Sequence, residues 1–157
     1  MNGFVKIFRC FNVAKVRYLV VGGVAVNLHG YPRFTGDLDI LLFLDEENLK
    51  KVDNVMRKLS YSERLPVSIM DLKDKNLKAF TFNPPYGSLL QVDIVIEASL
   101  KFDKFFKKRL VKVFDGVRIP VVSIEDLIEM KKKTGRSKDK IDLSVLKILK
   151  QLGKNAL

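Results

Sequence analysis

Three aspartates that stand in otherwise apolar segments are the residues of this sequence best suited to chemistry. Asp37 and Asp39 lie in the run 37–44, and Asp93 lies in the run 89–96. Because strand side chains alternate between the two faces, Asp37 and Asp39 are expected to point the same way. Neighbouring carboxylates repel each other, and a divalent cation such as Mg²⁺ or Mn²⁺, which prefers oxygen ligands, offsets that repulsion. If the two strands are neighbours, the three carboxylates converge and can bridge two metal ions.

Two consecutive glycines after a short apolar strand supply a second part of such a site. The β-branched run 18–21 ends at Gly22 and Gly23. Glycines let the backbone approach a phosphate, and the helix that follows points its N–H groups at the anion. The spacing fits neither the G-x-G-x-x-G dinucleotide fingerprint nor a P-loop. Taken alone, the pair is more commonly a tight turn.

Length and composition limit the class of protein. The chain has 157 residues, 47% of them hydrophobic and 30% charged, which favours a single globular domain over 1–157. The apolar runs are far shorter than the roughly 20 residues of a membrane helix. The segment 1–16 lacks the uninterrupted apolar region of a signal peptide. One cysteine, Cys10, excludes an internal disulfide. We therefore expect a cytoplasmic protein without a membrane span.

The charge balance is informative about partners. The formal net charge of +11 favours polyanions, either a nucleotide triphosphate or a nucleic acid. A lysine-rich surface that only keeps the protein in solution is the alternative.

Both helices and strands are needed to position these residues, and local sequence signals mark where several of them begin or end. Asp45 and Ser137 are suited to cap helices, Ser123 opens a variant capping box, and Asp115-Gly116 suits a two-residue hairpin turn. The order predicts an α/β or α+β fold. Helices are expected over 1–16, 24–28, 45–59, 123–133 and 138–152, and strands over 18–22, 37–44, 89–96, 111–114 and 117–122, with one or two more within 65–82.

In this order, the motifs resemble those of the DNA polymerase β-like nucleotidyltransferase superfamily. The resemblance covers residues 18–96 and implies a single domain with a mixed β-sheet flanked by helices, in which 123–152 is a C-terminal helical segment. It implies Asp37, Asp39 and Asp93 as catalytic and metal-binding residues. The motifs that carry it are Val20-Val-Gly-Gly23, Arg33-Phe-Thr-Gly-Asp37, Asp37-Leu-Asp-Ile40 and Val92-Asp-Ile94. The nucleotide-binding residues that it implies in this part of the chain are Gly22, Gly23, Arg33 and Thr35.

A second resemblance lies in the segment 129–143, which is similar to the C-terminal segment of AbiE-type toxin nucleotidyltransferases and their relatives. It implies that Lys131 contacts the nucleotide phosphates, that Arg136 and Lys138 add positive charge, and that Asp139 or Asp142 orients them or assists catalysis. The alternative is a charged helix–turn–helix surface with intrahelical ion pairs, such as Lys138 with Asp142.

The function expected from these resemblances is transfer of a nucleoside monophosphate from an NTP to an acceptor hydroxyl, with release of pyrophosphate. The sequence leaves the acceptor open between an RNA or tRNA, a partner protein and a small molecule, and a toxin or antitoxin role stays open as well. The alternative is a catalytically silent module that binds RNA or a partner protein through the basic stretch 101–112. That stretch also fits an amphipathic helix with its phenylalanines in the core.

His29 is expected to be a surface residue near a helix end.

Overall fold

The computed structural model describes residues 2–74, 77–96 and 101–155. Helices and strands alternate along the chain, as the sequence predicts. The helices are α1 (Asn2–Val13), α2 (Gly22–Leu28), α3 (Glu46–Lys58), the 3-10 helix η1 (Ile69–Asp74), α4 (Phe102–Lys107), α5 (Ile124–Lys132) and α6 (Ser137–Asn155). The strands are β1 (Tyr18–Val21), β2 (Asp37–Leu42), β3 (Ser62–Glu63), β4 (Ala79–Asn83), β5 (Gln91–Val95), β6 (Leu110–Phe114) and β7 (Val117–Val121).

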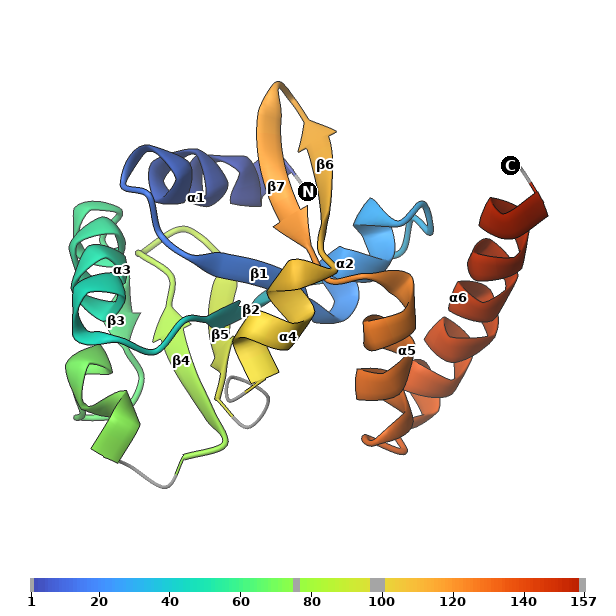
Figure 1. Ribbon diagram of the computed structural model, residues 1–157. Coiled ribbons are helices and arrows are strands. Elements are labelled where there is room, and N and C mark those ends of the chain that lie inside the picture. Colours follow the sequence, from blue (N-terminus) through green and yellow to red (C-terminus); the bar gives the residue numbers. More distant parts are fainter. Residues whose placement is uncertain (1, 75–76, 97–100, 156–157) are drawn as a thin grey trace.

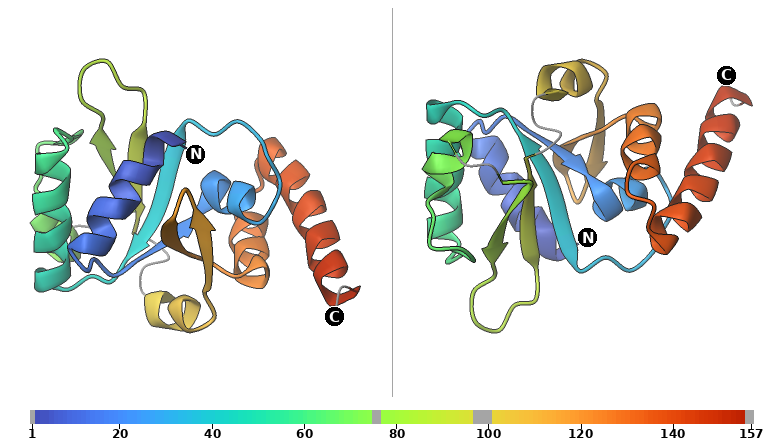
Figure 2. Two further views of the ribbon diagram at one scale, coloured as in Figure 1. Left: turned by 90° about the horizontal axis from the view of Figure 1, so that it is seen from above. Right: turned by 90° about the horizontal axis from the view of Figure 1, so that it is seen from below.

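One mixed sheet organises the described part of the chain. Its seven strands follow the order β3-β4-β5-β2-β1-β7-β6. β2 runs parallel to β5 and β1 runs parallel to β7, whereas the other neighbouring pairs are antiparallel. The views place α1 and α3 at one end of the molecule and the pair α5 and α6 at the other, with the central strands between them (Figures 1 and 2). This architecture confirms the mixed sheet flanked by helices.

Local sequence signals explain several boundaries. The Asp45 carboxylate accepts a hydrogen bond from the Asn48 N–H and so caps α3, and the Ser123 hydroxyl caps α5 by accepting from the Asp126 N–H. Asp115 and Gly116 adopt positive φ angles of 51° and 74° in the β6–β7 turn, as the two-residue hairpin requires.

Some boundaries differ from the predicted ones. The first helix ends at Val13 rather than at residue 16, because the chain turns at Lys15, whose φ is 60°. The last helix begins at Ser137 itself and runs beyond residue 152, to Asn155. Between residues 65 and 82 the chain forms a 3-10 helix before β4, where the sequence pattern is weak.

One part of the core lies between α1, α3 and the sheet, and the same buried cluster continues into α2, α4, α5 and α6. The apolar face of α1, which includes Phe4, Phe8 and Phe11, is buried. Phe8 stacks on Tyr18 of β1 with a centroid separation of 6.2 Å, and Phe11 lies 5.1 Å from the same ring. Burial of these rings, each a large apolar surface, holds β1 in place at the centre of the sheet. These contacts therefore anchor the start of β1 to α1.

The basic stretch 101–112 is divided between a helix and an edge strand. Phe102 and Phe105 on α4 are buried, each 2% exposed, while the lysines of this helix face solvent. This is the amphipathic arrangement that the sequence offers as an alternative to a nucleic-acid footprint. Among the described residues, no helix is long and apolar enough to cross a membrane.

Candidate active site

The sheet register brings the predicted carboxylates together at the start of two parallel strands. Asp39 of β2 pairs directly with Asp93 of β5, and Asp37 pairs with Gln91. Paired residues on neighbouring strands lie about 5 Å apart and share a face. The Asp93 carboxylate accepts hydrogen bonds from the Thr81 hydroxyl at 2.8 Å and from the Gln91 amide at 3.0 Å. Asp37 is exposed, whereas Asp39 and Asp93 are half-buried.

The electrostatics of this cluster are unbalanced. Burial, followed by the negative charges of Asp93 and Asp37, raises the pKa of Asp39 from its ordinary value of 3.8 to about 7. Lys131 and Arg136 lower it, but they do not compensate fully. A carboxylate whose ionised form is disfavoured in this way by burial and by specific charged neighbours is a common feature of functional sites.

Gly22 lies directly against the carboxylate cluster. Its φ is +67°, a left-handed conformation that glycine adopts without strain. A Cβ built on Gly22 would overlap the Asp39 carboxylate, and one built on Gly23 would lie 2.9 Å from both Arg33 Nη2 and Thr35 Oγ1. The two glycines therefore allow the start of α2 to approach the side chains of the site.

We expect Gly22→Ala to lower the free energy of unfolding by about 1–3 kcal/mol, because it combines an unfavourable φ with a steric overlap. Urea denaturation would measure the change. Gly153→Ala is the matched control, since Gly153 lies within α6 and a Cβ there meets no atom within 4 Å. The control should be neutral or slightly stabilising. Equal effects of the two substitutions would contradict the role given to Gly22.

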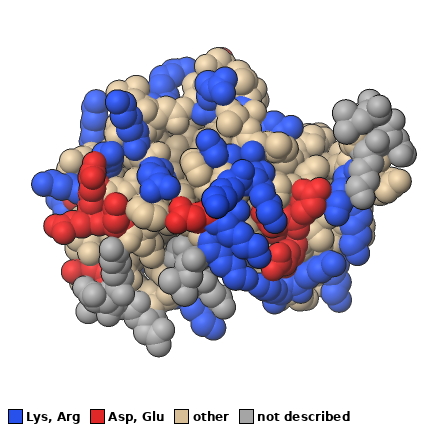
Figure 3. All heavy atoms as spheres, in the orientation of Figure 1, with Lys and Arg blue, Asp and Glu red and all other residues tan. Residues whose placement is uncertain are grey.

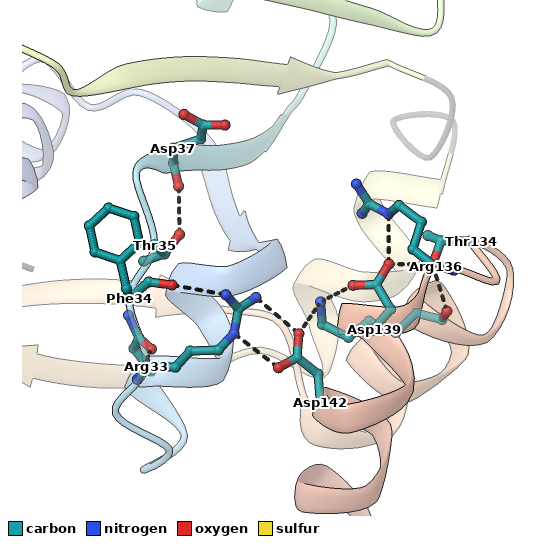
Figure 4. A network of polar contacts seen from close by, with 10 residues as sticks. Arg33, Phe34, Thr35, Asp37, Thr134, Arg136, Asp139 and Asp142 are labelled. Atoms are coloured by element: carbon teal, nitrogen blue, oxygen red, sulfur yellow. Dashed lines mark hydrogen bonds and ion pairs between the residues drawn. The ribbon is translucent and has the colours of Figure 1, made fainter.

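A buried ion-pair network forms the opposite wall of the site (Figure 4). The Lys131 ammonium lies 3.0 Å from both Asp139 and Asp142. The Arg33 guanidinium donates to Asp142 through Nη2 at 2.9 Å, and its Nε lies 2.9 Å from the other carboxylate oxygen. Arg136 Nε donates to Asp139 at 2.8 Å. The network thus ties α5, α6 and the loop before β2 together across a long stretch of sequence.

Asp139 is held ionised by this network. Its burial favours a higher pKa, but hydrogen bonds from Thr134, Lys131 and Arg136 together outweigh burial and lower the pKa from 3.8 to about 2. Since the folded-state pKa is depressed, the ionised carboxylate stabilises the fold above about pH 4, and this contribution is lost as the pH falls toward 2.

We therefore expect wild-type protein to be more stable than Asp139→Asn by about 2 kcal/mol at pH 6, and this difference should shrink toward zero near pH 2. Urea unfolding of both proteins over this pH range would measure it. A difference that stays constant with pH would show that the Asp139 charge is not what stabilises the fold.

The two walls enclose one cavity of about 750 Å³. With the exception of Asp142, the alternative to Asp139, every residue that the sequence singled out for catalysis, metal binding or nucleotide binding contributes to its lining. These residues are Gly22, Gly23, Arg33, Thr35, Asp37, Asp39, Asp93, Lys131, Arg136, Lys138 and Asp139. Lys and Arg side chains gather over α4 and α5 on the face seen in Figure 3, with acidic side chains between them.

Two interpretations of the sequence are wrong: the ion-pair partner of Asp142 and the exposure of His29. Asp142 does not pair with Lys138 along α6; it pairs with Lys131 and Arg33, because it points inward and is only 1% exposed. His29 is not a surface residue. It is 9% exposed, and its Nε2 lies 2.7 Å from the Val122 carbonyl oxygen, while burial lowers its pKa.

The cavity is also lined by residues to which the sequence analysis gave no role in the site. Phe34 and Lys101 line it, although the sequence analysis gave Phe34 no role and treated Lys101 only as part of the basic stretch. An aromatic residue inside the Arg-x-Thr-x-Asp segment was the available signal for Phe34. Lys101 comes from the start of α4, and only the fold could place it here.

The carboxylate set can be compared with the needs of a metal. Its donors are oxygens only, which matches Mg²⁺ or Mn²⁺ rather than a soft metal. Burial is the main cause of the raised pKa of Asp39, and Asp93 and Asp37 add to it, so a divalent cation bound beside these carboxylates would lower that pKa. Within the residues that the structure describes, no group of three or more His, Cys, Asp or Glu side chains forms a ready metal site. The donor chemistry therefore fits the metal, while the side-chain positions are not those of a closed ligand shell.

Together, the mixed sheet, the two glycines and the Asp-x-Asp strand beside a third aspartate define a nucleotidyltransferase of the DNA polymerase β-like superfamily. A family profile matches residues 9–157, and the chain belongs to that family, DUF6036, described as nucleotidyltransferases of unknown function. A comparison with curated protein sequences finds no significant match.

Solved structures share the fold at low sequence identity. The lincosamide antibiotic adenylyltransferase LnuA, bound to lincomycin, superposes with a TM-score of 0.62 at 18% identity, covering 91% of this chain and 93% of that one. An antigenic nucleotidyltransferase-like protein from Paracoccidioides brasiliensis gives 0.64 at 16% identity, covering 96% of this chain and 75% of that one. The antibiotic-resistance factor ANT(2'')-Ia gives 0.56 at 12% identity, covering 96% and 89%.

Proposed function

We propose that this protein transfers a nucleoside monophosphate from an NTP to an acceptor hydroxyl and releases pyrophosphate, in the presence of Mg²⁺ or Mn²⁺. The observation that carries the proposal is the opposition of two walls across one cavity. Asp37, Asp39 and Asp93 stand on one side, and the cations of the Lys131 network stand on the other. A triphosphate between them has metal-binding carboxylates at one end and positive charge at the other.

The basic wall keeps an excess of positive charge even though its members are paired. Three cations, Arg33, Lys131 and Arg136, share two carboxylates, Asp139 and Asp142, which leaves a net charge of 3 − 2 = +1. Lys138, which is exposed, adds a further charge at the same cavity. Because the carboxylates fix the cations in position, little reorganisation is needed when phosphates bind.

The glycines would keep the start of α2 close to the bound phosphates. A Cβ on Gly22 would overlap the Asp39 carboxylate, and a Cβ on Gly23 would crowd Arg33 and Thr35. The proposed metal would be held by Asp37, Asp39 and Asp93, and when bound it would neutralise phosphate charge and lower the pKa of the attacking hydroxyl. The contribution of the remaining residues is positioning and charge compensation.

Isothermal titration calorimetry with each NTP, with and without Mg²⁺, tests nucleotide binding. We expect binding that requires the metal and that is lost in the double variant with Asp37→Ala and Asp39→Ala. Incubation with labelled NTP tests transfer, with a cell lysate or lincomycin, the ligand of one structural neighbour, as the acceptor. Metal-independent binding, or binding that the double variant retains, would refute the proposed site.

A silent scaffold predicts a different result. Such a module would bind RNA with a steep salt dependence and never label an acceptor. The raised pKa of Asp39 favours the enzyme over the silent scaffold. Ionised Asp39 destabilises the fold, and a protein that does not use the carboxylates would gain nothing from keeping them together. The acceptor, whether an RNA, a tRNA, a partner protein or a small molecule, would be identified from whatever becomes labelled.

A further inference from the structure

Phe34 is an aromatic side chain that the fold leaves in solvent at the candidate site. It is 89% exposed, and it lines the same cavity as Asp37 and Asp39. A phenylalanine exposed to this extent contributes almost nothing to the hydrophobic stabilisation of the fold. Single exposed apolar residues are common on protein surfaces, so its position and its neighbours must decide whether it has a role.

The loop that carries Phe34 is fixed rather than loose. The Arg33 and Thr35 side chains both turn inward, because each lies within 2.9 Å of a Cβ built on Gly23. Arg33 Nη1 donates to the Phe34 carbonyl oxygen at 3.0 Å, and the same guanidinium is held by Asp142. Since neighbouring side chains in an extended segment alternate, Phe34 points outward. Figure 4 shows its ring on the side of the loop away from the ion-pair network.

A second exposed apolar side chain precedes the neighbouring strand. Leu89 is 90% exposed and stands two residues before Gln91, which pairs with Asp37. Because β2 and β5 are parallel, the segments that lead into these two strands lie at the same end of the sheet. Phe34 and Leu89 thus lie near the same end of the sheet, although only Phe34 lines the cavity.

We propose that Phe34 is a stacking platform for a nucleobase at the mouth of the cavity. The inference rests on the proposed function, which places the triphosphate between the glycines and Lys131. Phe34 is only three residues from Asp37, on the side away from the phosphate-binding cations. A base stacked there belongs either to a nucleic-acid acceptor whose hydroxyl approaches the carboxylates or to the incoming NTP. Every base offers a π-face to an aromatic ring, and the net charge of +11 attracts the phosphates attached to it.

The absence of tryptophan from the sequence makes this stacking directly measurable. In Phe34→Trp the new indole is the sole tryptophan, and a base stacked on it quenches its fluorescence. One titration uses NTP with Mg²⁺, and another uses a short single-stranded RNA. Inorganic triphosphate and an abasic strand of the same length are the base-free references. We expect quenching by at least one base-containing ligand and none by the references, and the ligand that quenches identifies the source of the base.

Val13→Trp is the matched control, because Val13 is 81% exposed at the end of α1 and does not line the cavity. Its fluorescence should not respond to any of the ligands. Equal quenching of both tryptophans would show collision rather than a site and would overturn the proposal. Quenching of neither would overturn it as well.

A binding measurement separates stacking from simple apolar contact. Phe34→Leu should weaken binding of the quenching ligand about 5-fold to 150-fold, while Phe34→Tyr should retain it, because only the tyrosine keeps an aromatic face. Equal binding by the Leu and Tyr variants would contradict stacking. Binding of NTP to the wild-type protein is measured separately by calorimetry. If it is present while Phe34 shows no stacking, this inference fails and the proposed function stands; if it is missing, the proposed function itself fails.

Discussion

Replacing Asp39 by Asn is expected to reduce nucleotidyl transfer roughly 100-fold to 1,000-fold, a loss of the size seen when one preorganised electrostatic group is removed from an active site. Asp39 is the best placed of the three carboxylates for such an effect, because it pairs with Asp93 in register and lies against Gly22. The initial rate of labelled-product formation at saturating NTP would measure the loss. Magnesium-dependent binding of the NTP should weaken in parallel.

The same substitution should stabilise the fold. The pKa of Asp39 is raised from 3.8 to about 7, so its ionised form is disfavoured in the folded protein. The resulting loss of folding stability is absent below about pH 4, where Asp39 is protonated in both the folded and the unfolded protein. The loss is fully present above about pH 7. The Asn variant should therefore gain stability over the wild type as the pH rises through this range, by the order of 1–4 kcal/mol.

Opposite changes in activity and stability distinguish a functional carboxylate from a structural one. Asp71→Asn is the control, because Asp71 is exposed in η1 and does not line the cavity. It should leave both quantities unchanged. An Asp39→Asn protein that keeps its activity, or that loses stability at pH 8, would contradict the role given to this cluster.

Asp142→Asn is expected to have the largest effect on stability. Asp142 is 1% exposed and accepts from both Arg33 and Lys131, so its loss leaves two cations at a buried position with only Asp139 to compensate. Removing one partner of a buried ion pair costs about 3–5 kcal/mol. Urea unfolding near pH 7 would measure this loss. NTP binding should also weaken, because Arg33 loses the contact that fixes its loop.

A surface ion pair supplies the control for Asp142. Asp53 accepts from Arg57 Nε with both carboxylate oxygens, at 3.0 and 3.1 Å, but the Arg57 side chain is 69% exposed. Asp53→Asn should change the free energy of unfolding by less than about 1 kcal/mol, as exposed pairs do. If both substitutions cost the same, then burial is not what makes the Asp142 network stabilising.

The sequence predicted those features that depend on short-range patterns. Alternation along β2 placed Asp37 and Asp39 on one face, and left-handed backbone at Asp115-Gly116 closed the predicted hairpin. The helix caps at Asp45 and Ser123 form as expected. Each of these depends on residues within a few positions of one another, where spacing alone determines geometry.

Features that depend on long-range contacts could not be predicted in the same way. Spacing along α6 suggested Lys138 as the partner of Asp142, but the partners come from α5 and from Arg33, far away in the sequence. The exposure of Phe34 could not be predicted either, because phenylalanine side chains are more often buried. The direct register of Asp39 with Asp93 required knowledge of which strands are neighbours.

The Arg33–Asp142 contact joins residues 109 positions apart, and this separation has a consequence for synthesis on the ribosome. Domains begin to fold while the chain is still being made, but Lys131 and Arg33 stay without their shared carboxylate until α6 has emerged. Contacts of such long sequence separation also form slowly, because a large loop must close first. A nascent chain would thus contain β2 and β5 with their carboxylates well before the cations opposite them are fixed, and the complete site would form only after α6 has been synthesised.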